Sequence, residues 1–217
     1  MWKHLDDLIA RYPVLKPCRE TIAAAVQALI SAYQRGGKLL LCGNGGSAAD
    51  CEHIAGELMK SFVLPRPLKE ADKQALRALT GEERMGELLQ EGLPAVSLCG
   101  HPALTTAFAN DVDPALGYAQ QVWALGRAGD ILLGISTSGN AENVCAAAVA
   151  ARAKGMCVLG LTGDSGGRLA GLCDICVKAP AGETYKIQEL HLPVYHAMCL
   201  ILEEVFFKAA SCENNGQ

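Results

Sequence analysis

The chain has 217 residues, of which 50% are hydrophobic, and its formal net charge is −4. This length suits one large α/β domain, and the apolar content excludes an intrinsically disordered chain. The sequence has no basic footprint for nucleic acid and no apolar run of the roughly 18 residues that cross a membrane, and its first residues are too acidic for a secretory signal. We therefore expect a cytoplasmic protein with neither nucleic-acid nor membrane partners.

Hydrophobic spacing predicts that helices and strands alternate along the chain. A helix is predicted at 18–33, within an N-terminal helical region that spans 1–35. Short apolar runs typical of buried parallel strands lie at 38–42, 95–99, 130–136, 156–162 and 174–180. Further helical patterns lie at 51–62, 102–110, 117–126, 136–155 (a loop leading into a helix), 165–172 and 185–209. This alternation predicts a single α/β domain: a three-layer, doubly wound parallel sheet of about five strands with a flavodoxin-like strand order.

The segment 63–92 departs from this alternation. It is rich in charge, contains Pro65 and Pro67, and is longer than the few residues that a direct connection needs. It predicts one or two exposed helices inserted between the first helix of the sheet and the second strand. We favour a contact between subunits as its role, and a spacer or a lid over a site are the alternatives.

Ten cysteines are present, and most of them lie inside hydrophobic runs, where a reduced cysteine acts as a small buried apolar residue. Cys173 and Cys176 form a single C-x-x-C. Its segment is predicted to be a strand, in which positions three apart point to opposite faces of the sheet. Because no second pair completes a four-cysteine metal site, a structural role is favoured, and a metal or redox role stays open.

Two loops rich in glycine and hydroxyl groups, GNGGS and STSGN, follow the first and third predicted strands. In the flavodoxin-like order, the carboxyl ends of these two strands flank the crevice where open α/β sheets bind ligands. Hydroxyl groups and the free N–H groups of a helix N-terminus suit the oxygens of a phosphate. The candidate anion-binding residues are Asn44, Gly45, Gly46, Ser47, Ser136, Thr137 and Ser138.

Two other interpretations of these loops remain. Their serine, threonine and asparagine side chains can simply cap helices. The first loop also fits the G-x-G-x-x-G/A pattern of dinucleotide-binding proteins, but Gly100 and His101 follow the second strand, where that pattern predicts an acidic residue. No Gly-Lys-Ser/Thr of a Walker motif is present.

Two further groups of polar side chains lie on predicted helices. His53 and Glu57 are four residues apart and share a helix face, which suits a metal ion, although a plain surface pair is the favoured interpretation of that spacing alone. The last helix carries a second group, in which His191 alone is typical of a partly buried histidine with a hydrogen-bond partner. This group consists of Gln188, Glu189, His191 and His196, with Pro193 among them.

In chain order, GNGGSAAD-x-x-H-x-x-x-E, AND, GISTSGN and IQELH-x-x-x-x-H resemble the motifs of the phosphoheptose isomerases, which belong to the sugar isomerase (SIS) domain superfamily. The resemblance covers about 36–207 except for the insertion at 63–92. It implies a single SIS domain over 1–217 that converts sedoheptulose 7-phosphate to D-glycero-D-manno-heptose 7-phosphate. It also implies a homotetramer with sites at subunit interfaces and one zinc ion in each site.

The same resemblance implies roles for individual residues. The implied metal ligands are His53, Glu57, Gln188 and His196. Glu57 and His196 are the implied acid/base pair, which suits an isomerisation in which a proton moves between neighbouring carbons through an enediol. The implied substrate contacts are Asn44, Gly45, Gly46, Ser47, Asn110, Asp111, Ser136, Thr137, Ser138 and Gln188.

The chain departs from the family pattern in three places. Ala141 stands where the family usually has a serine, Pro193 falls inside the last motif, and the insertion is untypical of the best-known members. Two other functions therefore stay open: isomerisation of a different phosphosugar, and a non-catalytic role as a sugar-phosphate-binding regulatory or scaffold protein.

Overall fold

The computed structural model of the chain describes residues 2–213, and their side chains through residue 208. Five parallel strands form one sheet in the order β2-β1-β3-β4-β5. These strands are β1 (Leu39–Gly43), β2 (Ala95–Ser97), β3 (Ile131–Ser136), β4 (Cys157–Thr162) and β5 (Ile175–Lys178). The predicted fold class and strand order are confirmed. β2 is shorter than predicted because the chain turns into a 3₁₀ helix at Leu98–Gly100.

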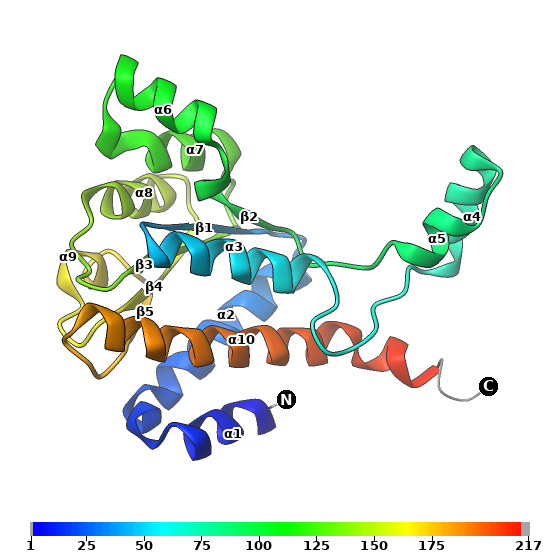
Figure 1. Cartoon of the computed structure of the whole chain (residues 1–217), viewed down its shortest axis with the longest axis horizontal. Coiled ribbons are helices and arrows are strands. Elements are labelled where there is room, and N and C mark those ends of the chain that lie inside the picture. Colours follow the sequence, from blue (N-terminus) through cyan, green and yellow to red (C-terminus); the bar gives the residue numbers. More distant parts are fainter. Residues whose placement is uncertain (1, 214–217) are drawn as a thin grey trace.

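Helices cover both faces of the sheet (Figure 1). The first face carries α1 (Lys3–Arg11), α2 (Arg19–Gln34), α3 (Gly46–Met59) and α10 (Thr184–Glu213). The second face carries α7 (Gly117–Leu125), α8 (Glu142–Ala153) and α9 (Gly167–Ala170), and α6 (Pro102–Asp111) packs against α7, away from the sheet. Two more 3₁₀ helices, at Pro13–Cys18 and Pro114–Leu116, link α1 to α2 and α6 to α7.

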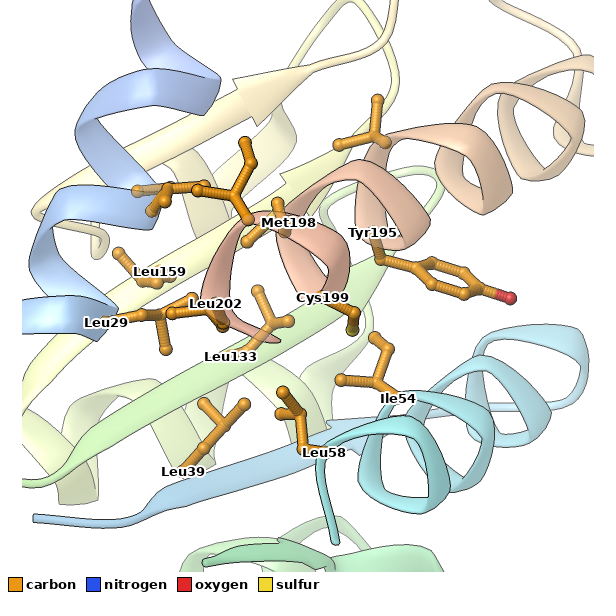
Figure 2. Close-up of a cluster of buried hydrophobic side chains, with 14 of the residues drawn as sticks. Leu29, Leu39, Ile54, Leu58, Leu133, Leu159, Tyr195, Met198, Cys199 and Leu202 are labelled. Atoms are coloured by element: carbon orange, nitrogen blue, oxygen red, sulfur yellow. The ribbon is translucent and has the colours of Figure 1, made fainter. Parts of the chain in front are cut away.

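Each buried strand contributes side chains to both faces, since successive residues of a strand point in opposite directions. In β1, Leu39 and Leu41 pack into the core under α2, α3 and α10, whereas Leu40 and Cys42 pack under α7 and α8. Figure 2 shows the first of these cores, in which Leu133 of the sheet lies among side chains of the surrounding helices. Strands buried on both faces explain the continuous apolar runs in the sequence.

Helix α10 crosses the first face of the sheet and is largely buried there. By length and composition alone, Thr184–Lys208 could cross a membrane, but 61% of its most apolar window is buried within the fold. Tyr195, Met198, Cys199 and Leu202 are among its core residues (Figure 2). The helix continues through Pro193. We interpret α10 as a core helix of a folded domain.

Between α3 and β2, residues 68–89 form a helical arm that projects away from the sheet (Figure 1). It consists of α4 (Glu70–Thr80) and α5 (Arg84–Leu88), which pack against each other. Its base is closed by an antiparallel bridge between Pro67 and Gln90 and by a 2.8 Å hydrogen bond from Glu91 N–H to Arg66 O. Helix α4 buries none of its residues, so the arm exposes apolar side chains such as Leu79 and Leu88.

The expectation that Cys173 and Cys176 point to opposite faces is wrong. Cys173 lies in the turn before β5, not in the strand, so the period-two rule does not apply to it. Both sulfur atoms instead lie over Gly160 of β4: a Cβ on that glycine would stand 2.6 Å from Cys173 Sγ and 3.1 Å from Cys176 Sγ.

Candidate active site

The two loops identified in the sequence meet in one cavity at the carboxyl ends of β1 and β3. The cavity is open to solvent and has a volume of about 370 Å³. Thr184 and Gln188 of α10 close one side of it. Its walls are formed by Asn44, Gly45, Gly46, Ser47, Ile135, Ser136, Thr137, Ser138, Ala141, Thr184 and Gln188. Residues almost 150 positions apart thus converge on one cavity at the switch point of the sheet.

The GNGGS loop presents the N-terminus of α3 to this cavity. Gly45 has a φ of 56°, a left-handed conformation that favours glycine and that turns the chain directly into the helix. Ser47 is buried in the first turn. Asn44 exchanges two 2.9 Å hydrogen bonds with Asn143 at the start of α8, so the amide pair ties the first loop to the second. Asn143 could not be identified from the sequence, because its partner lies 99 residues away.

Hydrogen bonds hold the STSGN loop. Ser138 Oγ accepts from Asn140 N–H at 3.1 Å, a bond within the loop that does not cap α8, whose N-cap residue is Ala141. Thr137 O accepts from Gly163 N–H at 2.9 Å, which fixes the loop against the end of β4. Ala141 lines the cavity at the N-cap of α8, where it makes no side-chain capping hydrogen bond.

Helix α10 lies beside α3 and places two polar side chains along it (Figure 1). Gln188 packs on Gly46 at the cavity: a Cβ on this glycine would stand 2.5 Å from Gln188 Nε2. Eight residues further along α10, His196 packs edge-to-face on His53, with ring centroids 5.0 Å apart. Eight helical residues correspond to about 12 Å, so Gln188 and His196 contact α3 at different points along its length.

His53, Glu57 and His196 form the second part of the site. His53 Nε2 lies 3.2 Å from Glu57 Oε1. Burial, with a contribution from His53, lowers the pKa of His196, so its ring is neutral at pH 7. His196 also lines a separate cavity between α10 and α1, beside Arg11 and Tyr12.

Tyr195 and Asp50 orient His53 through the ring nitrogen that faces away from Glu57. The Tyr195 hydroxyl donates to Asp50 Oδ1 at 3.1 Å and lies 3.1 Å from His53 Nδ1. Because that hydroxyl proton is used on Asp50, the tyrosine oxygen accepts from a proton on His53 Nδ1. His53 Nε2 then directs its lone pair at the carboxylate of Glu57. Two acceptors that face each other this closely need a proton or a cation between them.

The residues here fit a divalent metal in their chemistry. Imidazole nitrogen and carboxylate oxygen are usual zinc ligands, and a hydrogen bond to the second ring nitrogen is the usual support of a metal-bound histidine. His196 Nε2 is buried and, within the described residues, has no hydrogen-bond partner. In that same part of the chain, no three His, Cys, Asp or Glu side chains are already grouped as a metal cage. Gln188 lies about 12 Å from His196 along α10, at the loop cavity.

Three predicted residues lie outside these contacts. Asn110 and Asp111, at the end of α6, are exposed; the Asn110 amide donates to Asp111 at 2.8 Å, and neither lines the loop cavity. His191 is fully buried, not partly buried as expected. Its Nε2–H donates to Thr162 O at 3.1 Å, while its Nδ1 has no partner among the described residues.

A buried ion pair that the sequence analysis missed supports Glu57. Arg66, 1% exposed, contacts Glu203 through Nε at 2.9 Å and through Nη2 at 2.8 Å. Its guanidinium also donates to the carbonyls of Glu57 and Leu58 at the end of α3. Arg66 is therefore a positioning residue, which fixes the turn of helix that carries Glu57.

The chain is similar in sequence and fold to known proteins. The SIS domain family model matches residues 12–85 and 87–163. The chain is 39% identical over 208 residues to the phosphoheptose isomerase of Roseiflexus sp. (strain RS-1), a match that covers 94% of this chain and 93% of that protein. The solved phosphoheptose isomerase of Neisseria gonorrhoeae superposes with a TM-score of 0.73 at 35% identity, covering 93% and 95% of the two chains. That of Francisella tularensis superposes with a TM-score of 0.74 at 33% identity, covering 90% and 91%.

Proposed function

Since the chain belongs to the phosphoheptose isomerases, a family of SIS-domain proteins, we propose that it converts sedoheptulose 7-phosphate to D-glycero-D-manno-heptose 7-phosphate. The observation that carries this proposal is the cavity shared by GNGGS and STSGN, beside which α3 and α10 place Glu57, His53 and His196 together further along the same pair of helices. The phosphate and the reacting carbons of one sugar have separate places in this arrangement.

The phosphate binds between the two loops. The N-terminus of α3 supplies backbone N–H groups and the positive end of a helix dipole, and Ser136, Thr137 and Ser138 supply hydroxyl donors. An acidic chain can hold a phosphate in this way without a lysine or arginine. Ala141 removes one hydroxyl that the family usually offers, but the other donors remain.

Glu57 and His196 move the protons. The carboxylate of Glu57 removes the proton from the carbon next to the sugar carbonyl, which gives an enediol, and returns a proton to the neighbouring carbon. His196, neutral at pH 7 because burial lowers its pKa, exchanges the proton of the adjacent oxygen. Arg66 holds Glu57 in place through its backbone carbonyl, and Tyr195 holds the neighbouring His53 through Nδ1.

A zinc ion is part of the proposal. His53, Glu57 and His196 would hold it, with Gln188 as the further ligand that the family resemblance implies. When bound, the metal would polarise the sugar carbonyl and stabilise the negative charge that develops on its oxygen. The orphaned Nε2 of His196 and the acceptor pair of His53 and Glu57 support this assignment.

The assembly is proposed to be a cytoplasmic homotetramer with its sites at subunit interfaces. Apolar side chains that the single chain leaves exposed support an assembly of several copies: Leu104, Val112, Leu116 and Trp123 on or near α6 and α7, and Met59, Val63 and Leu88 on or near the arm. Asn110 and Asp111, which stand apart from the cavity of their own chain, would reach a substrate only across such an interface.

The test is an isomerase assay of the purified protein with sedoheptulose 7-phosphate and zinc. Glu57→Gln removes the base while keeping the size of the side chain, and we expect kcat to fall by at least about 10²-fold. Glu52→Gln makes the same change on the exposed face of α3 and is expected to keep its activity. Undiminished activity in Glu57→Gln would reject the mechanism. Turnover of a different phosphosugar alone, across a panel of aldose and ketose phosphates, would keep the reaction class and replace the substrate.

A further inference from the structure

Cys173 and Cys176 lie together against Gly160 on the second face of the sheet. Gly160 pairs with Cys176 across β4 and β5, so both positions point to the same face. A Cβ on Gly160 would stand 2.6 Å from Cys173 Sγ and 3.1 Å from Cys176 Sγ. The two sulfur atoms therefore lie close to each other. The glycine provides the space that the two thiols occupy together.

The turn between the cysteines is fixed by hydrogen bonds. Asp174 N–H donates to Val158 O at 2.8 Å, and the Asp174 carboxylate accepts from Val158 N–H at 2.7 Å. Arg152 Nη1 approaches the same carboxylate at 3.4 Å. Because the residue between the two thiols is anchored on β4, the pair is held in place before any reaction.

The two thiols differ in chemistry. The neighbouring Cys173 thiol lowers the pKa of Cys176 to about 7, an effect assisted by the Lys178 ammonium and opposed by burial. The same contact and burial raise the pKa of Cys173. Both residues are half-buried and not sealed in the core. A partly exposed thiolate beside a second thiol is the environment of reactive cysteine pairs.

We propose that Cys173 and Cys176 are a thiol–disulfide exchange site that reacts with low-molecular-weight disulfides. The Cys176 thiolate attacks a disulfide R–S–S–R, which forms the Cys176–S–S–R bond and releases one thiolate R–S⁻. Cys173 then loses its proton and attacks Cys176 Sγ, which forms the Cys173–Cys176 bond and releases the second R–S⁻. Two protein thiols are oxidised and one small disulfide is reduced to two thiols, so the electrons balance.

The two thiols are separate from the proposed isomerase site, since neither cysteine lines the loop cavity or contacts His53, Glu57 or His196. The test uses the reduced full-length protein, equilibrated in mixtures of reduced and oxidised glutathione, quenched by alkylation and mapped by peptide mass spectrometry. The expected result is loss of alkylation at Cys173 and Cys176 together, an intramolecular cross-link between them, and full reversal by dithiothreitol.

Single variants identify the attacking sulfur. Cys173→Ser should trap glutathione on Cys176, whereas Cys176→Ser should leave Cys173 largely alkylatable. Cys157→Ser is the matched control, because Cys157 is also half-buried on β4 but faces Asp174, and it should leave the cross-link unchanged. The proposal fails if both thiols of the folded wild type stay alkylatable at every glutathione ratio, or if a different pair becomes cross-linked instead. The wild-type result decides this even where a variant does not fold.

Discussion

Gln188 and Gly46 lie so close that the glycine leaves no room for a side chain: a Cβ at position 46 would stand 2.5 Å from Gln188 Nε2. Gly46 therefore does more than begin α3. It lets α10 approach the GNGGS loop and sets the position of an amide that lines the cavity.

Gly46→Ala should displace Gln188 and lower kcat/KM by roughly 10- to 100-fold, the scale expected when a binding group moves by about 1 Å. The φ of Gly46 is not positive, so alanine is compatible with its backbone. Gly56→Ala on the same helix is the control: a Cβ there meets nothing within 4 Å, and stability should rise by up to about 1 kcal/mol with activity intact. Steady-state kinetics and thermal unfolding measure both. Equal kinetics for the two variants would contradict the role given to Gly46.

Tyr195→Phe tests the support of the proposed metal ligand. Without the hydroxyl, His53 Nδ1 loses its acceptor and Asp50 loses a donor, so the imidazole is no longer held in one tautomer. Zinc affinity should fall by about 10- to 100-fold, and activity should return at excess zinc. Competition with a chromophoric chelator measures the affinity. Tyr33→Phe is the control: the hydroxyl of Tyr33, on α2, donates to Pro94 O, so its loss should leave zinc binding as in the wild type. If the two variants bind zinc equally well, Tyr195 does not orient His53.

Removing either partner of the Arg66–Glu203 ion pair should lower the free energy of unfolding, and removing Glu203 should lower it more. Glu203 also accepts the N–H groups of Phe62, Val63 and Leu64, so Glu203→Leu leaves three backbone donors and a cation unpaired. We expect a loss of about 3–5 kcal/mol or more for Glu203→Leu and a smaller loss for Arg66→Met, whose carboxylate partner keeps its backbone donors.

Urea unfolding measures these losses. Glu83→Gln, which breaks the exposed pair with Arg77 in the arm, should cost less than about 1 kcal/mol. A larger loss for Arg66→Met than for Glu203→Leu would show that the guanidinium, and not the carboxylate, organises this segment.

His191 should make the fold sensitive to mild acid. Burial lowers the pKa of His191 to about 4, against about 6.5 in the unfolded chain. Between about pH 6.5 and pH 4, His191 therefore binds a proton in the unfolded state but not in the folded state. The free energy of unfolding falls as the pH decreases through this range. The full loss is about 3 kcal/mol at about 1.4 kcal/mol per pH unit.

His191→Gln keeps an N–H for Thr162 O but does not titrate. Between pH 7 and 4, the free energy of unfolding of the wild type should drop by about 3 kcal/mol more than that of the variant. Parallel pH profiles in urea unfolding would mean that His191 already carries a proton, or a solvent path, in the folded state.

The fold and the loops could be predicted because their signals are local. Continuous apolar runs mark strands that are buried on both faces, and glycine- and serine-rich turns mark the places where those strands enter helices. The same local signals led to the error at Cys173, since they place a strand boundary only to within a few residues and one residue decides which way a side chain points.

The supporting residues could not be predicted for the opposite reason. Asn143, Tyr195 and Arg66 look ordinary in the sequence, and their importance depends on partners that lie 99, 142 and 137 residues away. Burial of an arginine is unusual and becomes visible only when its carboxylate partner is placed beside it.

The closed base of the helical arm makes changes in the arm independent of the rest of the fold. Because Pro67 pairs with Gln90 and Glu91 N–H bonds Arg66 O, the chain enters and leaves the arm at neighbouring points. The arm beyond this base could be lengthened, shortened or replaced by a tight turn without changing the order of the strands. Arg66, at the base, is different, because its guanidinium also donates to the carbonyl of Glu57. A change confined to the arm would therefore leave the position of Glu57 unchanged.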